Sequence, residues 1–425
     1  MSEGSSVQDV VIVGAGAAGI GAAKQATADG LRFTVLEAAP RIGGRAVTDP
    51  RPFGLPWDAG CHWLHSASVN PFTKLADAYG FRYATGSPET RLLLDGVDVT
   101  DRKAEVDAYE EAAYHAALRA GGNGEDVPVA VVVDTSSPYY GRFAMSIRAE
   151  WGASPEETST INVSGYDAAY TGEDWPVQDG YGALVARHAA GIPVELSTPV
   201  TRIEWGRTPI RVHTLRGVLE TRAVVVTVST NVLADEVIAF EPPLPHQKLE
   251  ALRNVPLGRA NKVGILVDDG RRLGVDGHGG ALVWSSSDPA RGLAFQLRPF
   301  GWDFANAYIA GDLCGELERA GEAAMVAYAL ENLRALLGSD IDRHVRATAV
   351  TRWESEPYIR GAYAVAKPGH GHDRAVIREP LADRVHFAGE ALSEAWFSTC
   401  HGAYLSGMEA VGEAVASMRA IVSPG

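Results

Sequence analysis

Three glycines near the N-terminus, Gly14, Gly16 and Gly19, stand in the spacing G-x-G-x-x-G. They follow a run of β-branched residues at 10–13 and precede an alanine-rich stretch, which predicts a strand, a tight turn and a helix. In such a turn the first glycine permits the bend, the second lets the backbone approach a pyrophosphate, and the third lets helix and strand pack closely. Because the helix N-terminus also presents free N–H groups to phosphate, the spacing predicts a dinucleotide site.

Glu37 closes the next predicted strand, which covers residues 33–36. A carboxylate at this place suits the 2′-hydroxyl of a ribose and repels a 2′-phosphate, which argues against NADP. The glycine motif and this acid therefore define the adenosine half of the cofactor. They leave the redox half open, because NAD and a flavin share such a site.

The C-terminal stretch 384–415 has the pattern of a second cofactor element: a strand, a turn of small residues and an acid, Glu390. Gly389 and Gly402 permit close approach of the backbone to a ligand. A final helix at 401–421 would direct its positive end toward whatever lies above Thr399, and such a dipole stabilises negative charge on a reduced flavin ring. An NAD dehydrogenase usually completes its cofactor sheet in one stretch, so this late element favours a flavin.

Lys262 lies inside an apolar strand pattern, RANKVGIL at residues 259–266. A lysine is costly to bury unless its ammonium group has a partner or a chemical purpose. The position therefore predicts a functional lysine, with a strand-end lysine that reaches solvent as the alternative.

Composition restricts the function classes. The chain has 425 residues, 46% hydrophobic and 21% charged, which is typical of a soluble enzyme of two or three domains, and its formal net charge is −15. That charge disfavours nucleic acid and anionic membranes as partners. Three scattered cysteines without a C-x-x-C pattern predict neither disulfides nor a metal site. The polar, acidic N-terminus is unlike a signal peptide, and the apolar run at 10–23 is too short to span a bilayer, so we expect a cytoplasmic protein.

Strand and helix signals alternate along the chain, with an amphipathic helix predicted at 322–337. The simplest arrangement is an α/β (α+β) two-domain fold. A Rossmann-type cofactor domain would be assembled from residues 1–75, 180–240 and 375–425. Residues 76–179 and 241–374 would form a substrate domain with a mixed sheet and helices.

Six blocks of the sequence, in order, resemble the flavin-containing amine oxidase family, on its polyamine oxidase and monoamine oxidase side. They begin with EAAPRIGGR and WDAGCHWLHSASVNPF, and the full set covers residues 37–45, 57–72, 178–205, 241–267, 353–369 and 386–407. The segments 80–173 and 268–352 carry little of the likeness.

The resemblance implies an FAD cofactor. Arg45 makes physical sense in such a site, because a guanidinium group can pair bidentately with phosphate oxygens. Monoamine oxidases tether the flavin through a cysteine before an aromatic residue; Ala362 and Tyr363 stand here, which implies non-covalent FAD. The implied cofactor-binding residues are Gly14, Gly16, Gly19, Glu37, Gly43, Gly44, Arg45, Trp63, Val200, Trp353, Gly389, Glu390, Thr399 and Cys400.

The resemblance also implies the catalytic residues. In the family the lysine at Lys262 holds a water against flavin N5 and takes part in reoxidation by O2, and Tyr363 forms one wall of an aromatic cage. Thr399 stands where the opposite aromatic wall would be, which widens the site. His65 could contact the substrate, although an ordinary loop residue is the simpler interpretation. The implied reaction takes a hydride from the α-carbon of a polyamine or other small amine to flavin N5, and O2 then yields H2O2.

Other functions on the same frame stay open at this point. An L-amino-acid oxidase would need an arginine for the substrate carboxylate, and Arg298 or Arg360 could supply it. A desaturase would need a long apolar tunnel, and a non-catalytic flavin-binding protein would have no use for Lys262 and Tyr363. The expected partners are an amine and O2, and the sequence does not distinguish a monomer from a homodimer.

Overall fold

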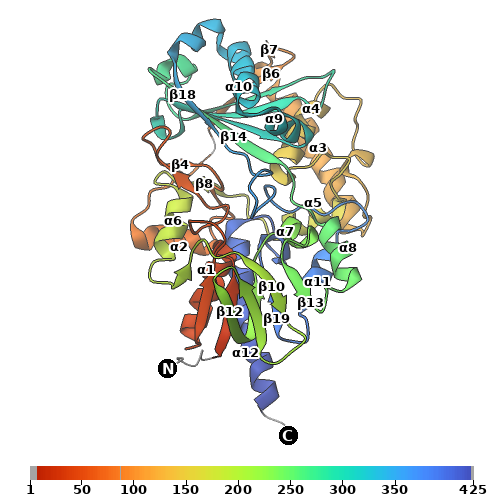
Figure 1. Cartoon of the computed structure of the whole chain (residues 1–425). Coiled ribbons are helices and arrows are strands. Elements are labelled where there is room, and N and C mark those ends of the chain that lie inside the picture. The colour runs from red at the N-terminus through yellow and green to blue at the C-terminus, as the bar shows by residue number, and fades with distance from the viewer. Residues whose placement is uncertain (1–6, 87, 423–425) are drawn as a thin grey trace.

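The computed structural model describes residues 7–86 and 88–422 and contains two large β-sheets, which lie toward opposite ends of the molecule (Figure 1). The first sheet has eight strands in the order β13-β10-β11-β12-β1-β2-β9, and β19 pairs with β12. Its strands are β1 (Gln8–Val13), β2 (Phe33–Leu36), β9 (Val194–Glu195), β10 (Val200–Glu204), β11 (Ile210–Thr214), β12 (Gly217–Val226), β13 (Ala239–Glu241) and β19 (Val385–Phe387).

The centre of the first sheet is parallel: β1 pairs with β2 and β12, and β12 pairs with β19. Such strands are covered on both faces, and Val10, Ile12, Val224 and Val225 are fully buried. The connection from β1 to β2 runs through α1 (Ala17–Ala28), so the predicted strand, turn and helix are confirmed.

Helix α12 (Cys400–Val422) packs along α1, which joins the two ends of the described chain (Figure 1). Two glycines make this approach possible. A Cβ on Gly21 would lie 2.0 Å from the carbonyl oxygen of Tyr404, and a Cβ on Gly407 would lie 1.9 Å from that of Ala18. The helices could not come this close with any larger residue at these positions.

The second sheet has seven strands in the order β18-β14-β17-β16-β15-β6-β7, antiparallel except where β6 runs parallel to β15. Helices α9 (Asp312–Ala320) and α10 (Glu322–Leu337) pack on it, and Met325 and Leu333 join its core. The predicted helix at 322–337 is thus confirmed. The strands are β6 (Glu89–Leu94), β7 (Val97–Asp98), β14 (Ala260–Val267), β15 (Gly279–Trp284), β16 (Gly292–Leu297), β17 (Phe304–Ala310) and β18 (Val345–Val350).

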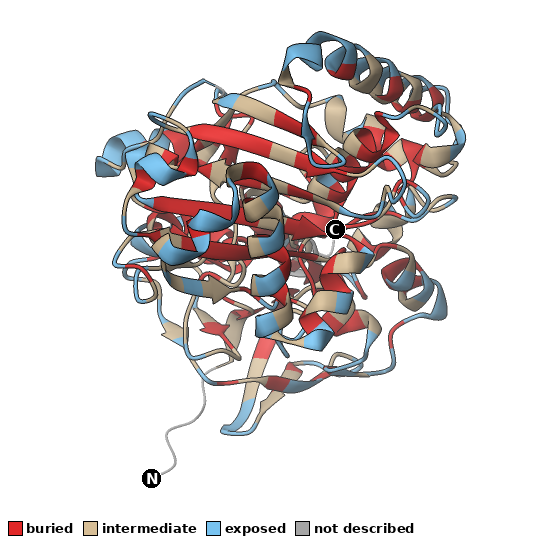
Figure 2. Ribbon diagram, turned by 90° about the horizontal axis from the view of Figure 1, so that it is seen from above, coloured by how far each residue is buried: buried red, intermediate tan, exposed pale blue. Residues whose placement is uncertain are grey.

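Smaller elements occupy the space between and beside the sheets, and buried strands run through the middle of the molecule while the outer helix faces are exposed (Figure 2). Two short ribbons pair β3 (Thr48–Asp49) with β4 (Trp57–Asp58), and β5 (Trp63–His65) with β8 (Asp174–Pro176). The remaining helices are α2 (Pro71–Tyr79), α3 (Lys103–Gly122), α4 (Tyr140–Trp151), α5 (Thr160–Asp167), α6 (Tyr181–His188), α7 (Thr230–Ala234), α8 (His246–Asn254) and α11 (Asp373–Arg378).

The predicted two-domain α/β fold is confirmed. Strands of the first sheet come from residues 8–36, 194–241 and 385–387, and strands of the second come from residues 89–98 and 260–350. The chain therefore leaves the first sheet and returns to it, as a discontinuous cofactor domain requires. The exact domain boundaries stay a prediction.

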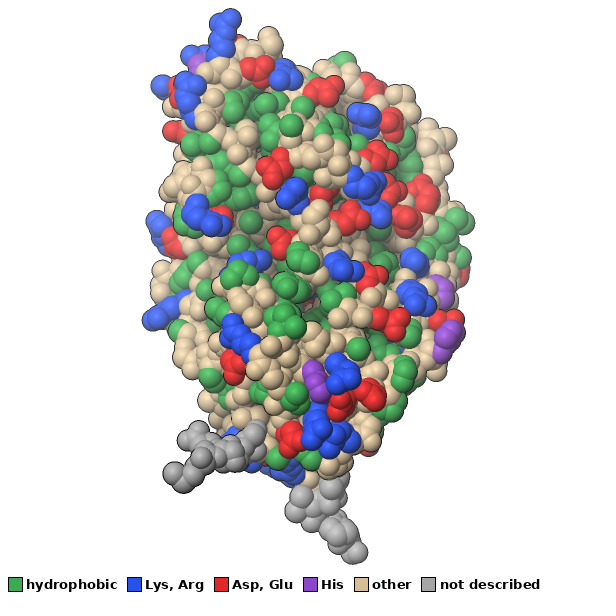
Figure 3. Space-filling view, viewed as in Figure 1, with side chains coloured by type: hydrophobic (Ala, Val, Ile, Leu, Met, Phe, Trp, Pro, Cys, Tyr) green, Lys and Arg blue, Asp and Glu red, His purple; other side chains and the backbone are tan. Residues whose placement is uncertain are grey.

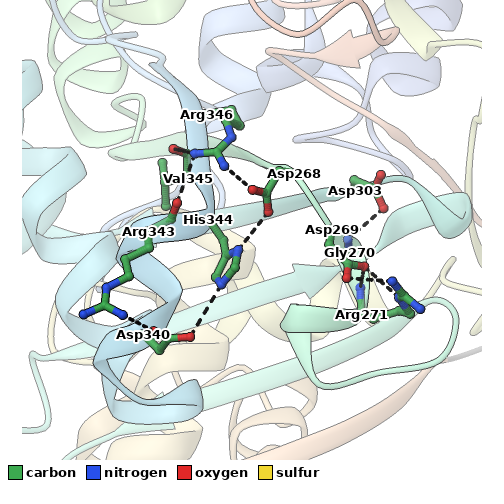
Figure 4. A network of polar contacts seen from close by, with 10 residues as sticks. All are labelled: Asp268, Asp269, Gly270, Arg271, Asp303, Asp340, Arg343, His344, Val345 and Arg346. Carbon is green, nitrogen blue, oxygen red and sulfur yellow. Dashed lines mark hydrogen bonds and ion pairs between the residues drawn. The ribbon is translucent and has the colours of Figure 1, made fainter.

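Acidic and basic side chains are interspersed over the face of the molecule in Figure 3. One exposed network ties the end of β14 to β18 (Figure 4). Asp268 accepts a hydrogen bond from His344 at 2.9 Å and pairs with Arg346, and these contacts lower the pKa of Asp268. In the described part of the chain, no helix combines the length and apolar character needed to cross a bilayer.

Candidate active site

The glycine turn after β1 excludes side chains at two positions and leaves room at the third. Gly14 has φ +107°, and a Cβ there would lie 2.5 Å from Oγ1 of Thr227; a Cβ on Gly19 would lie 1.9 Å from the carbonyl oxygen of Gly14. At Gly16 the nearest atom to such a Cβ is Cα of Gly44, 3.9 Å away. The protein does not fill the space beside Gly16, which is the property that a phosphate-binding turn requires.

Gly43 and Gly44 cross over this turn. The backbone N–H of Gly43 donates to the carbonyl of Ala15 at 2.8 Å, and Gly43 forms a bridge with Gly16. Both have positive φ values, +96° and +56°, which favour glycine. The pair therefore lies next to the predicted diphosphate position.

Glu37 stands at the mouth of the same turn. Its carboxylate accepts hydrogen bonds from the backbone N–H groups of Ala15 at 2.7 Å and Ala39 at 2.8 Å. Its own carbonyl accepts from Thr198 N, which brings the start of β10 at Val200 alongside. Glu37 and Val200, two of the residues predicted to bind the cofactor, thus lie on neighbouring segments.

The C-terminal turn meets the N-terminal motif through an ion pair between Arg45 and Glu390. Nη1 of Arg45 lies 2.8 Å from Oε1 of Glu390 and 2.5 Å from the carbonyl oxygen of Ala362. The other carboxylate oxygen accepts from the N–H groups of Ala364 and Ser398. Arg45, which the sequence placed on phosphate, has its guanidinium group engaged with protein oxygens here.

A pocket beside this ion pair is lined by Arg45, residues 226–230 and residues 387–392. Gly389, in its wall, has φ +144° with no heavy atom within 4 Å of a Cβ position. Segments from the start, the middle and the end of the chain therefore converge on one space. A positive side chain, unoccupied space at glycines and a nearby helix N-terminus fit a dinucleotide.

Thr399 caps helix α12: its hydroxyl accepts from the N–H of Gly402 at 3.0 Å and donates to the carbonyl of Trp396 at 2.7 Å. A Cβ on Gly402 would lie 1.8 Å from that same carbonyl oxygen, so this glycine permits an approach within the protein itself. The neighbouring thiol of Cys400, together with burial, raises the pKa of Cys61.

Lys262 is buried in the middle of β14, with 4% of its surface exposed, so it does not reach solvent. Its Nζ lies 2.8 Å from the carbonyl oxygen of Asp58, 2.6 Å from that of Gly60 and 2.9 Å from Nδ1 of His62. Burial lowers the pKa of Lys262 to about 8, against the opposing charges of Asp58 and Cys61. The lysine thus has the partners that its burial demands.

Tyr363 and Trp353 lie near this lysine. Tyr308 is the β17 residue paired with Lys262, and its hydroxyl lies 2.6 Å from that of Tyr363, which itself donates to the carbonyl of Ala149. The indole of Trp353 packs within 3.5 Å of a Cβ position at Gly60. The structure therefore brings Lys262, Tyr363 and Trp353 around the loop at residues 57–63.

His65 and Trp63 lie in β5, beside β8. Nδ1 of His65 lies 2.8 Å from Asp174, whose other oxygen accepts from the hydroxyl of Tyr170 at 2.7 Å. Burial opposes ionisation of Asp174, but these hydrogen bonds hold its pKa below the usual range. Asp174 therefore holds His65 in place at the edge of this ribbon.

Three further residues of the site escaped the sequence analysis: Asp58, His62 and Glu150. Asp58 caps helix α6 through the N–H groups of Tyr181 and Gly182, and burial raises its pKa to about 6. Asp58 and His62 lie within the block at residues 57–72 that resembles the family. That resemblance could have identified them as site residues.

Glu150 ends helix α4, next to the carbonyl that Tyr363 contacts, in a segment without such likeness. Burial raises the pKa of Glu150 to about 8, and the negative charge of Glu110 acts in the same direction.

Comparisons with known proteins agree with this geometry. The family described as flavin containing amine oxidoreductase matches residues 17–101 and 136–415. Lysine-specific histone demethylase 2 of Homo sapiens is 24% identical over 94% of this chain and 52% of its own length, so the chain spans about half of that relative. Polyamine oxidase 1 of Oryza sativa subsp. japonica is 26% identical over 94% of this chain and 95% of its own.

Solved structures show the same fold. Putrescine oxidase bound to putrescine superimposes with a TM-score of 0.79 at 21% identity, covering 96% of this chain and 99% of that one. Cyclohexylamine oxidase from Brevibacterium oxydans IH-35A gives 0.78 at 21% identity, covering 97% and 100%. With the family matched over most of its length, the chain belongs to the flavin containing amine oxidoreductases.

Proposed function

We propose that the protein is an FAD-dependent amine oxidase that acts on a polyamine or another small primary or secondary amine. The observation that carries the proposal is the link between Lys262 and the cofactor pocket. The lysine contacts the carbonyl of Gly60, and the carbonyl of Arg45 accepts from the N–H of Cys61. Arg45 in turn pairs with Glu390 at the pocket. These contacts support a position for the buried amine near the proposed cofactor site.

FAD would be held non-covalently by the glycine turn, Glu37, Arg45 and the turn around Glu390. Residue 362 is alanine, which offers no thiol for a covalent link. When bound, FAD supplies the acceptor for a hydride from the substrate α-carbon, and O2 then takes the electrons to give H2O2, while the oxidised substrate hydrolyses to an aldehyde. The protein needs no nucleophile for this reaction.

The side chains around Lys262 would orient the amine and exclude water. The hydroxyls of Tyr308 and Tyr363 bond to each other and to the backbone of Ala149, so both rings are held in place. A fixed wall of this kind lowers the entropic cost of aligning a C–H bond. The reacting nitrogen must be neutral to release a hydride, and Lys262, with a pKa of about 8, is able to exchange a proton near neutral pH.

An acidic and aromatic surface favours a substrate with more than one nitrogen. The side chain of Glu150 is exposed in this structure, and desolvation by neighbouring protein atoms nevertheless raises its pKa. The hydroxyl of Tyr114 lies 3.4 Å from its carboxylate, and the negative charge of Asp174 also raises its pKa. Carboxylates and tyrosine rings, including those of Tyr166 and Tyr170, are the groups that bind an alkylammonium ion.

No specific contact favours an amino-acid oxidase. Arg298 donates to the carbonyls of Val275 and Asp276, and Arg360 pairs with Asp235 at 2.5 Å. Both guanidinium groups are therefore engaged away from Lys262. The experiment below also tests whether the protein is an amino-acid oxidase.

The test is an anaerobic titration of the purified yellow protein, followed by loss of the flavin absorption. The panel contains putrescine, spermidine, phenylethylamine, N-methyllysine and several L-amino acids. We expect bleaching by at least one amine. Bleaching by L-amino acids alone would assign the alternative oxidase, and a flavin that no compound reduces would refute the proposal.

A further inference from the structure

A chain of buried and half-buried side chains leads from an indole to Lys262. Nε1 of Trp57 lies 3.2 Å from Oδ1 of Asn306, and Nδ2 of Asn306 lies 3.2 Å from Oε1 of Gln296. Nε2 of Gln296 lies 3.0 Å from Nε2 of His62, whose Nδ1 lies 2.9 Å from Nζ of Lys262. Asn306 and Gln296 face each other across β17 and β16, so two neighbouring strands fix the centre of this relay.

The indole N–H of Trp57 sets the direction of every hydrogen bond in the relay. An indole N–H can only donate, so the atom of Asn306 that meets Trp57 must be its oxygen. Its NH2 group then faces Gln296, which must present its own oxygen there. The NH2 group of Gln296 is left for His62, whose Nε2 must therefore accept. Turning either amide around would place two donors against each other.

This direction determines the tautomer of His62. Burial lowers the pKa of His62 well below its usual value, so the imidazole is neutral. A neutral imidazole carries one proton. Because Nε2 accepts, the proton is on Nδ1, and Nδ1 donates to Nζ of Lys262.

The hydrogen bonds at Nζ of Lys262 can all be satisfied in only one protonation state. The two remaining partners of Lys262 are the carbonyl oxygens of Asp58 and Gly60, which only accept. A neutral amine has two hydrogens for these carbonyls and one lone pair for His62. An ammonium group would direct its third hydrogen at the N–H of His62, with no acceptor available.

We propose that His62 is a positioning residue that holds Lys262 as a neutral amine, with Trp57 as the fixed end of the relay. The catalytic meaning of this state rests on the proposed function. A neutral Lys262 does not repel a cationic amine that enters the site.

The other groups around Lys262 do not supply an alternative partner for its third hydrogen. The carboxylate of Asp58 faces Thr48 and the N-terminus of α6, and only its backbone carbonyl meets the lysine. Across the strand pairs, Lys262 faces Tyr308 of β17, and its backbone N–H donates to Thr351. The titratable and charged groups that act on the Lys262 and His62 pair are Asp58, Cys61, His65, His278 and Tyr308.

The experiment is a pH titration of the lysine side-chain nitrogens by NMR, on the flavin-bound protein labelled with ¹⁵N-lysine, without substrate. Lys262→Met identifies the signal. We expect Lys262 to be neutral at pH 8 in the native protein, with a midpoint below 8. In His62→Gln the amide oxygen can accept from an ammonium group, so the midpoint should rise by at least one pH unit.

Trp57→Phe is the sharper variant, because it changes no atom near Lys262. Without the indole donor both amides can turn around, Nε2 of His62 can donate to Gln296, and Nδ1 becomes free to accept from an ammonium group. The midpoint of Lys262 should rise here as well. His344→Gln is the matched control, since His344 bonds to Asp268 in the exposed network and should leave the midpoint unchanged.

A native midpoint above 8, or equal midpoints in the native protein and Trp57→Phe, would overturn the relay. The readout does not depend on turnover. If no amine bleaches the flavin and Lys262 is nevertheless neutral, the proposed function fails and the relay stands. If amines bleach the flavin and Lys262 is cationic at pH 8, the relay fails and the proposed function stands.

Discussion

Replacing Glu150 with glutamine should remove the preference for a substrate with a second ammonium group. The carboxylate ends α4 beside the tyrosines that surround the site, where burial raises its pKa to about 8. Hydrogen bonds to charged groups contribute about 1.5–3 kcal/mol. At about 1.4 kcal/mol per tenfold change, Glu150→Gln should lower kcat/KM for putrescine by roughly 10- to 100-fold. Butylamine, which lacks the second nitrogen, should change little.

The pKa of Glu150 determines in which direction the substrate preference changes with pH. A bound second ammonium group favours ionised Glu150, and below pH 8 the free protein must lose a proton before it can offer that charge. Below pH 8, each pH unit adds about 1.4 kcal/mol to the free energy of ionising Glu150. Screening reduces this cost, because part of the side chain is accessible to water. The ratio of kcat/KM for putrescine over butylamine should therefore rise about three- to tenfold from pH 7 to pH 8 and then level off.

The assay measures this ratio between pH 6 and 9, which cancels the deprotonation of the reacting nitrogen because both amines share it. In Glu150→Gln the ratio should be lower and independent of pH. Glu111→Gln, an exposed change on α3, is the matched control and should follow the native curve. A ratio that keeps its pH dependence in Glu150→Gln would refute the role of this carboxylate.

Three other changes, one of them with a matched control, test the site and the fold. Lys262→Met should slow turnover with O2 by roughly 10²-fold and change anaerobic bleaching much less, measured by stopped flow in each half-reaction. Gly407→Ala would place a Cβ 1.9 Å from a carbonyl oxygen of α1 and should destabilise by about 1–3 kcal/mol in denaturant unfolding. Gly412→Ala has no atom within 4 Å and should stabilise slightly. Arg45→Ala breaks the 2.8 Å pair with Glu390 and should release flavin on gel filtration, whereas a fully loaded variant would contradict the assignment.

The fold and the nucleotide turn were predictable because their signals are local. Gly14, Gly16 and Gly19 follow a buried strand within a few residues, and each has a different steric reason to be glycine. Lys262 was predictable for another local reason, since a charge inside an apolar strand is anomalous wherever the strand lies. Their roles toward a cofactor stay predictions.

Glu150 and His62 could not be found in the same way, because their chemistry depends on distant neighbours. In the sequence, Glu150 is a glutamate near a helix end like many others. Its unusual pKa arises from burial and from Glu110 on another helix. The tautomer that we assign to His62 depends on its contact with Gln296, which lies 234 residues further along the chain. No spacing rule connects such residues before the two sheets are brought together.

The loop at residues 57–63 links the two sheets, because it contacts Lys262 on one side and Arg45 on the other. Strand β14 is held by β17 on one side and β18 on the other, so Lys262 has a rigid base. The carbonyls that Lys262 contacts belong to this loop, which is held on its other side by Arg45: the N–H of Cys61 donates to the Arg45 carbonyl at 3.2 Å. A Cβ on Gly60 would lie 1.7 Å from that oxygen, so the loop has little freedom to shift. Because a reaction rate depends on placement within about an ångström, this double attachment would hold a lysine from one sheet in place toward the cofactor that we propose for the other.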